Sequence, residues 1–303
     1  MRPMYSAATS ATRRVQQPSA APAWRRRATT ALGTLVEVSA RCANDTDFER
    51  IVARAFERLQ HYQRHMSFHE AGSDLRAIAE AAPGDRVRVA PETWAVLDTA
   101  LAIEIETAGV FNAAIAPALV QRGLLPSPVR NAIGECAASA SAALQLLPDN
   151  EVLIRQRVWI DLGGIAKGAA VDAALAAARE TGADATIVNA SGDLAVFGDQ
   201  DHAIEIVGPS RQRVPAGWLG DGALASSGPF DGQGASSLVA EGRHAAWADR
   251  AVSVVAPTCQ MAEALTKVLA ILGDDAAPLL ARHGAVGFSV DAHGHLHTVG
   301  AAR

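Results

Sequence analysis

The sequence is short of aromatic residues, cysteines and excess positive charge, and each shortage excludes a class of protein. Aromatic residues make up 5% of the 303 residues, too few for a platform that stacks single-stranded bases. The net charge is −5, whereas a nucleic-acid binder needs a basic face. Cys42, Cys136 and Cys259 are far apart and odd in number, which favours separate thiols over a disulfide framework. We therefore expect no nucleic-acid partner.

Long apolar runs are absent as well. No stretch of about 18 apolar residues occurs, so we expect no transmembrane segment. The N-terminal residues are rich in Ser, Ala, Pro and Arg but lack the apolar stretch of an export signal, which by sequence favours the cytoplasm. We predict a disordered arm over residues 1–28 and one folded domain over residues 29–303.

Strands and isolated helices alternate irregularly along the rest of the chain. A capping box is expected at residues 46–49, before a helix that ends near Met66. Apolar periodicity predicts further helices over residues 91–107, 129–147, 165–181 and 261–272. Short β-branched runs predict strands, among them 158–162 and a final hairpin that turns at 293–294. This mixture favours an α+β fold over a doubly wound parallel sheet.

The strongest local pattern is DLGGIAKG, at residues 161–168. A strand delivers Asp161, two glycines turn the chain, and a helix opens with Lys167 in its first turn. The free N–H groups of such a turn attract phosphate, and a lysine adds a positive charge. The alternative is a plain tight turn with Lys167 in solvent, because the spacing matches neither the Walker A motif nor the Rossmann fingerprint.

A second pattern lies in the predicted helix 261–272, where Glu263, Thr266 and Lys267 share one face. A carboxylate and a hydroxyl on one face suit a hard cation such as Mg²⁺. The alternative is a surface ion pair between Glu263 and Lys267, four residues apart.

Three alternating histidines, His293, His295 and His297, stand in the final hairpin. On one face of a strand they could hold zinc. The competing interpretation, which we favour, is the exposed side of a hairpin.

Several blocks of the sequence, in the same order, resemble the FAD:protein FMN transferase family, also called the ApbE family. The DLGGIAKG block, followed by Asp172, is the closest match to the family pattern. The other similar blocks are residues 32–34, 66–75, 107–112, 189–193, 226–228, 252–258 and 262–273. Together they cover about residues 30–300.

This resemblance implies a T-fold-like α+β domain, with a mixed sheet and packed helices, that binds FAD and Mg²⁺. Members of the family transfer FMN from FAD to a threonine of an acceptor protein and release AMP, and some hydrolyse FAD to FMN and AMP instead. The family often acts outside the cytoplasmic membrane, on its periplasmic side, in contrast to the absence of an export signal here. Neither the acceptor protein nor the oligomeric state follows from the sequence.

The resemblance also assigns site residues. The expected flavin-binding residues are His69, Val110, Phe111, Asn112, Asp161 and Lys167. The expected Mg²⁺ ligands are the backbone oxygen of Ala166 and the side chains of Glu263 and Thr266.

This chain departs from the family at several of these positions. His69 replaces a tyrosine, Asn112 and Glu263 replace aspartates, and Lys267 stands where a threonine is usual. Ser237 and Ala240 occupy the places of a histidine and an aspartate, so no catalytic residue is assigned. The sequence therefore predicts an FMN transferase, with a weak or inactive flavin-binding protein and an FAD pyrophosphatase as alternatives.

Overall fold

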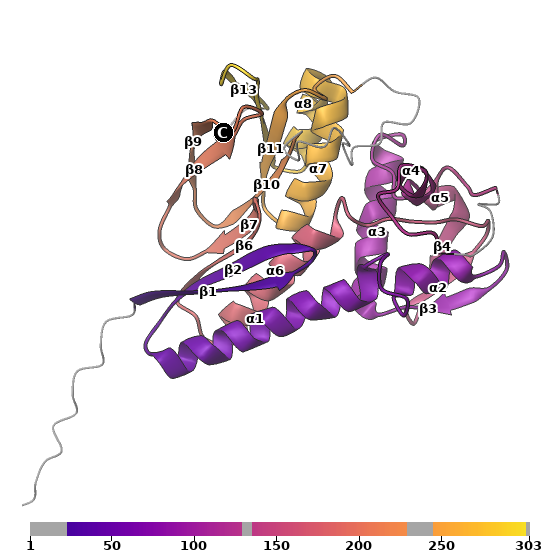
Figure 1. Ribbon diagram of the computed structural model, residues 1–303, viewed down its shortest axis with the longest axis horizontal. Helices are drawn as coiled ribbons and strands as arrows, with labels where there is room; N and C mark the ends of the chain where they lie inside the picture. The colour runs from indigo at the N-terminus through magenta and orange to yellow at the C-terminus, as the bar shows by residue number, and fades with distance from the viewer. Residues whose placement is uncertain (1–22, 129–134, 229–244, 301–303) are drawn as a thin grey trace, which may run out of the picture.

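A large antiparallel sheet organises one part of the molecule (Figure 1). A computed structural model of the protein describes residues 23–128, 135–228 and 245–300. Within these residues the sheet has eight strands, and every neighbouring pair is antiparallel. In spatial order they are β1 (Ala23–Ala31), β2 (Thr34–Cys42), β6 (Ala185–Ala190), β7 (Asp193–Phe197), β10 (Gly222–Ser227), β11 (Ala251–Ala256), β12 (Val286–Val290) and β13 (Leu296–Val299).

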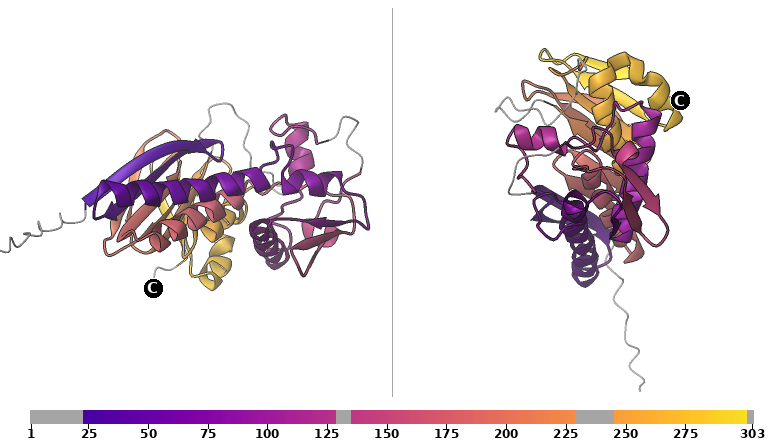
Figure 2. Two further views of the ribbon diagram at one scale, coloured as in Figure 1. Left: turned by 90° about the horizontal axis from the view of Figure 1, so that it is seen from below. Right: turned by 90° about the vertical axis from the view of Figure 1, so that its right-hand side faces the viewer.

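Three helices, α1 (Asp45–Met66), α6 (Ala166–Glu180) and α7 (Cys259–Leu272), cover one face of this sheet (Figure 2). Buried residues of α1 recur at helical spacing, and every second residue of β2 from Val36 is buried against them. The face of α6 that meets α1 is mostly alanine, which lets the two helices approach closely. The hairpin β8 (His202–Val207) and β9 (Arg213–Leu219) packs on the opposite face of the sheet.

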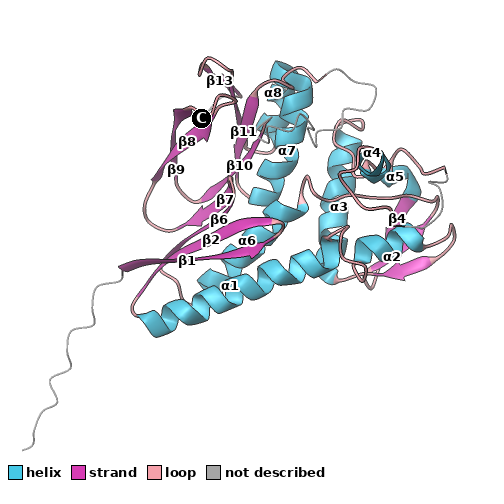
Figure 3. Ribbon diagram, in the orientation of Figure 1, coloured by secondary structure: helices cyan, strands magenta, loops and turns pink. Residues whose placement is uncertain are grey.

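The second part of the molecule lies beyond the end of α1 (Figure 3). It consists of α2 (Asp74–Glu80), α3 (Pro91–Glu106), α4 (Ala116–Gln121), α5 (Ala140–Ala143) and a small sheet in the order β3 (Arg86–Arg88), β5 (Glu151–Ile154), β4 (Leu144–Leu147). After α7 the chain continues through a 3₁₀ turn, Gly273–Ala276, and α8 (Ala277–Arg282). The α+β prediction is confirmed.

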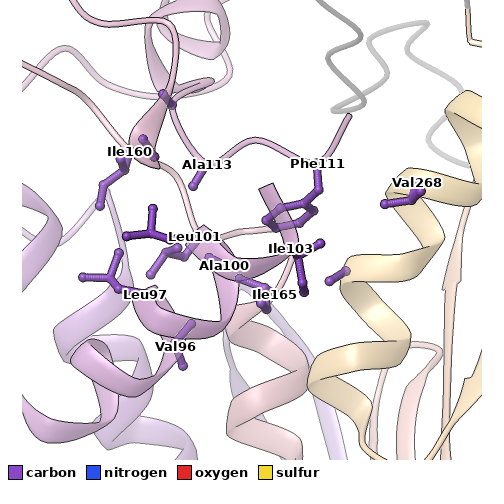
Figure 4. Close-up of a cluster of buried hydrophobic side chains, with 14 of the residues drawn as sticks. Val96, Leu97, Ala100, Leu101, Ile103, Phe111, Ala113, Ile160, Ile165 and Val268 are labelled. Atoms are coloured by element: carbon purple, nitrogen blue, oxygen red, sulfur yellow. The ribbon is translucent and has the colours of Figure 1, made fainter. Parts of the chain in front are cut away.

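One hydrophobic core joins the two parts. Leu97 and Ile103 of α3 pack in the same cluster as Phe111, Ile165 and Val268 (Figure 4). Val268 belongs to α7, which also contacts the large sheet. Helix α7 is therefore covered on both sides, and it is apolar or buried over almost its whole length.

The predicted start of the ordered chain was wrong for residues 23–28. They form most of β1, which pairs with β2 from Ala23 opposite Cys42. Arg25 and Arg27 of β1 form ion pairs with acidic residues of α1. Backbone hydrogen bonds to β2 and ion pairs to α1 hold this edge strand in place. Its arginine-rich sequence therefore lacks the alternating apolar residues from which a strand is predicted. Residues 1–22 of the predicted arm lie outside the described residues.

Three local predictions were also wrong. Residues 144–147 of the predicted helix 129–147 form a strand because they pair with β5, and of the described residues 135–147 only Ala140–Ala143 is helical. Val158, Trp159, Ile160 and Leu162 are buried, but residues 158–162 form no strand; the N–H of Asp161 instead donates to the carbonyl of Ala113 at 2.8 Å. Helix α1 is capped by Asn44, whose side chain accepts from the N–H of Asp47, and not by Thr46. The final hairpin is confirmed.

The N-terminal turns of α6 and α7 touch at Gly168. A Cβ atom on this residue would lie 2.3 Å from the carbonyl oxygen of Cys259 and 2.7 Å from the nitrogen of Gln260. One turn further along α6, the carboxylate of Asp172 accepts the N–H groups of Cys259 and Gln260 at 2.8 and 2.9 Å. A side chain of α6 thus caps the start of α7, and only glycine at 168 lets the two helices come this close.

We predict that Gly168→Ala destabilises the protein by about 3 kcal/mol, because its methyl group would meet backbone atoms that cannot move without separating α6 from α7. Urea unfolding measures the loss. Gly72→Ala is the matched control: no atom lies within 4 Å of its new methyl group, so a change within about 0.5 kcal/mol is expected. Equal effects of the two substitutions would contradict the close contact.

A pH dependence follows from Asp172. Burial raises its pKa to about 6, against the opposing effect of the two N–H donors. The folded state then binds this proton more tightly than the unfolded state, so the contribution of Asp172 to stability falls as the pH rises from about 4 to about 6. Urea titration at each pH measures the free energy of unfolding of wild type and of Asp172→Asn. The wild-type value minus the Asp172→Asn value is expected to fall as the pH rises across this window. The same substitution at an exposed aspartate, Asp98→Asn, is the matched control.

Candidate functional site

Two adjoining cavities lie where α6 begins. The larger, about 550 Å³, is bounded by the end of α1, the loop 66–70 and the turn 161–167. The smaller, about 120 Å³, lies between the loop 110–112, α4 and α7. Leu119, Asp161 and Gly163 line both cavities. The two spaces therefore meet at Asp161, and segments from both parts of the molecule form their walls.

Most of the residues predicted from the sequence line these cavities. His69, Ala166 and Lys167 line the larger cavity, Val110, Phe111 and Asn112 line the smaller one, and Asp161 lines both. Glu263 and Thr266 line neither, because they are buried behind the turn, with 1% and 0% of their surface exposed. Ser237 and Ala240 lie outside the described residues.

The turn itself uses most of its N–H groups internally. The N–H of Gly163 donates to the Asp161 carboxylate at 3.1 Å, and those of Ile165 and Ala166 donate to the carbonyl of Leu162. The N–H of Gly168 donates to Glu263 Oε2 at 2.7 Å. The turn therefore offers an anion fewer free donors than the sequence pattern suggested, and charged side chains carry more of that role.

Asp161 is held in place at the junction of the cavities. Burial raises the pKa of its carboxyl group, against the N–H of Gly163 and the positive charges of His69 and Lys267. A Cβ atom on Gly163 would lie 2.9 Å from Asp161 Oδ2. Glycine at this position therefore leaves room for the carboxylate to point back over the turn.

Buried charges lie directly behind the larger cavity. The ammonium of Lys167 forms an ion pair with Asp193 and lies 3.9 Å from Glu263 Oε1. Asp193 also accepts the N–H of Ser226 at 3.1 Å. Burial lowers the pKa of Lys167, but the two carboxylates outweigh it and the net shift is upward. Burial and the charge of Asp193 raise the pKa of Glu263, against the opposing positive charges of Lys267 and Lys167. The interpretation of Lys167 as a side chain free in solvent is wrong.

Lys267 lies beside the smaller cavity. Its Nζ donates to Ser227 Oγ at 3.0 Å and to Thr266 Oγ1 at 3.1 Å. The surface pair expected between Glu263 and Lys267 is therefore wrong. Because α7 is enclosed between the sheet and α3, its polar face points into the protein.

Comparison with known proteins decides the family, since the sequence profile of the ApbE family matches residues 32–290. The chain belongs to the ApbE family. The resemblance found in the sequence is thereby confirmed. A search of curated proteins gives no match.

Solved structures of ApbE proteins share the fold. The ApbE protein from Thermotoga maritima is 21% identical with a TM-score of 0.77, and the match covers 91% of this chain and 97% of that one. The flavin transferase ApbE from Vibrio cholerae is 18% identical with a TM-score of 0.76, covering 92% and 97%. The flavinyl transferase ApbE from Pseudomonas stutzeri is 17% identical with a TM-score of 0.75, covering 92% and 95%. At these identities the likeness shows the fold alone.

Asp193 is the site residue that sequence reasoning did not assign in this ApbE chain. It lies at the start of β7, 1% exposed, and forms the ion pair with Lys167. Its signal was present, because it ends the block 189–193 that resembles the family. What the sequence could not show is which cation it faces.

The residues expected to hold Mg²⁺ do not fit a divalent ion in this ApbE protein. The hydroxyl of Thr266 donates to the carbonyl of Glu263 at 2.7 Å and accepts from Lys267. Glu263 accepts from Gly168 through one oxygen, and the ammonium of Lys167 faces the other. Both side-chain ligands thus already face a cation, which would repel Mg²⁺. No group of three or more His, Cys, Asp and Glu in the described ranges has the arrangement of a metal site.

The three histidines of the final hairpin do not converge on one point. His295 Nδ1 lies 3.0 Å from Asp291 Oδ2, and His297 Nε2 lies 2.7 Å from Asp274 Oδ1. Separate carboxylate partners agree with the exposed-hairpin interpretation and not with a shared zinc ion.

Lys167 and Asp193 should be strongly coupled in this ApbE site. We predict that Lys167→Met and Asp193→Asn each destabilise the protein, and that the double variant loses about 1–2 kcal/mol less than their sum, because each single change leaves a buried charge without its partner. Urea unfolding of the four proteins gives the coupling. The exposed pair Arg213 and Glu205, 3.5 Å apart, is the matched control, where about 0.5 kcal/mol or less is expected. Additive effects at 167 and 193 would rule out the ion pair.

Proposed function

We propose that this protein is a flavin transferase, which binds FAD and transfers FMN to a threonine of an acceptor protein, releasing AMP. The observation that carries the proposal is the pair of adjoining cavities at Asp161, in a chain of the ApbE family. The larger cavity falls within the size range of small-molecule sites. An elongated molecule such as FAD could extend through both cavities, which meet at the Asp161 carboxylate.

The walls of the smaller cavity suit a flat aromatic ring. Val110, Phe111 and Ile271 supply apolar surface, while Asn112 and Asp161 supply polar atoms at its edge. Such a combination buries a ring system and fixes its orientation. We assign flavin contacts to His69, Val110, Phe111, Asn112 and Asp161. The phosphates would then lie where the two cavities meet, between Lys167 of the larger and Lys267 of the smaller.

The proposed reaction is a phosphoryl transfer. The hydroxyl oxygen of the acceptor threonine forms a bond to the FMN phosphorus of FAD, the bond to the bridging oxygen breaks, and AMP leaves with that oxygen. Catalysis of this kind depends mainly on positioning and on positive charge near the phosphates. The ammonium groups at the two cavities supply that charge. The base that accepts the threonine proton is not assigned.

One feature favours a second candidate, a flavin-binding protein with little or no turnover. Ser237 and Ala240 stand where the family carries a histidine and an aspartate, and neither side chain can exchange a proton near neutral pH. Loss of acid–base help costs about 10²–10⁴ in rate. Hydrolysis of FAD to FMN and AMP is a third outcome of the same site, with water in place of threonine.

A single incubation separates these functions. We predict that the protein with FAD and a set of threonine peptides releases AMP in equal amount to peptide-bound flavin, measured by chromatography and mass spectrometry. Peptides with Thr→Ala are the control and should carry no flavin. AMP without bound flavin would indicate hydrolysis, and FAD binding without AMP would indicate a binder. Absence of FAD binding would contradict all three.

A further inference from the structure

Both lysines of the chain lie at the two cavities of the candidate site. The sequence has 27 Lys and Arg residues, and only two of them, Lys167 and Lys267, are lysines. Each lines one of the two cavities. Elsewhere arginine provides the positive side chains, including the ion pairs of β1 with α1. A lysine ammonium is a compact point charge with three donors, unlike the planar guanidinium of arginine.

The two lysines differ in what they already bind. Lys167 faces two carboxylates, those of Asp193 and Glu263, so its charge is largely neutralised inside the protein. Lys267 instead donates to two neutral hydroxyls, those of Ser227 and Thr266. Asp161 and Glu263 feel this charge, but neither forms an ion pair with Lys267 among the described residues. More of the charge of Lys267 than of Lys167 is therefore left to attract an anion in the cavity.

The position of Lys267 is fixed by its surroundings. Its aliphatic stem lies against the turn at Gly164. If this glycine carried a Cβ atom, that atom would be 3.5 Å from Lys267 Cε and 3.6 Å from the ring of Phe111, both ordinary contact distances. Its ammonium is held between a hydroxyl of β10 and a hydroxyl of α7. One of these, Thr266 Oγ1, is an atom expected to bind the metal. A cation of the protein itself thus stands next to the expected metal ligand.

We propose that Lys267 supplies the charge that a divalent cation would supply, so that the protein binds the pyrophosphate of a flavin dinucleotide without a metal ion. This inference rests on the proposed function, because it assumes that FAD is the ligand. Lys267 donates hydrogen bonds to phosphate oxygens and neutralises one of their two negative charges. Because Lys267 is tethered covalently, a chelator cannot remove it.

The first test compares FAD binding in EDTA with binding in excess Mg²⁺, by calorimetry and by flavin fluorescence. The wild-type dissociation constant is expected to agree within about twofold between the two buffers. Lys267→Met should weaken FAD binding about tenfold or more but riboflavin binding much less, because riboflavin has no phosphate. The charge-matched control Arg213→Met removes a positive charge from the exposed β8–β9 hairpin and should leave both affinities unchanged.

A second measurement does not depend on the stability of the Lys267 variant. Protein labelled with ¹³C at the ε-carbon of lysine gives two side-chain NMR signals, because the chain has only two lysines. Lys167→Met identifies which signal belongs to Lys267. With EDTA present, FAD is expected to shift the Lys267 signal of the wild type beyond the shift that the shared flavin ring of riboflavin causes, because only FAD brings phosphates to the ammonium.

The outcomes separate this inference from the function on which it rests. FAD binding that tightens about tenfold or more with Mg²⁺ would overturn the role of Lys267 and leave the flavin transferase proposal standing. Equal affinity of wild type and Lys267→Met for FAD, or a Lys267 signal that FAD and riboflavin shift equally, would do the same. No FAD binding in either buffer would overturn both proposals. Metal-independent binding that is lost with the Lys267 charge is the result we expect.

Discussion

The contact between α6 and α7 at Gly168 sets the positions of Lys167, Glu263 and Lys267 relative to one another. Because no side chain stands between the helices, the N–H of Gly168 reaches Glu263, and Asp172 reaches the first N–H groups of α7. Lys167 precedes this contact by one residue, and Lys267 lies two turns along α7. The relative positions of the two ammonium groups therefore follow from one glycine.

The burial of α7 determines which partners its charged side chains have. The helix lies between the large sheet and the core that includes α3, so Glu263 and Thr266 are buried away from bulk water (Figure 1, Figure 4). Buried carboxylates then need a cation close by, and Lys167 meets that need for Asp193 and Glu263. The same enclosure directs Lys267 to hydroxyls and towards the cavity.

No helix in the described part of the chain is long and apolar enough to span a bilayer.

Much of the site could be predicted because the blocks that resemble the family stand in order along the chain. Asp161 and Phe111 line the cavities to which the resemblance pointed. The predictions that failed depended on pairing between distant segments. Strand β1 is recognisable only by its register with β2, and residues 144–147 became a strand because β5 lies beside them. Neither partner is visible in a local window of sequence.

The sequence by itself determined the α+β class, the family and the identity of the groups that could carry chemistry, because periodicity and ordered motifs are properties of the chain alone. Only the tertiary structure decided how those groups are used. Glu263 and Lys267, four residues apart on one helix, are consistent with a surface pair until packing buries one and hydrogen-bonds the other to Ser227 on β10. Which charge faces which partner depends on distances between segments about 25 to 100 residues apart, and close packing, not local sequence, sets those distances.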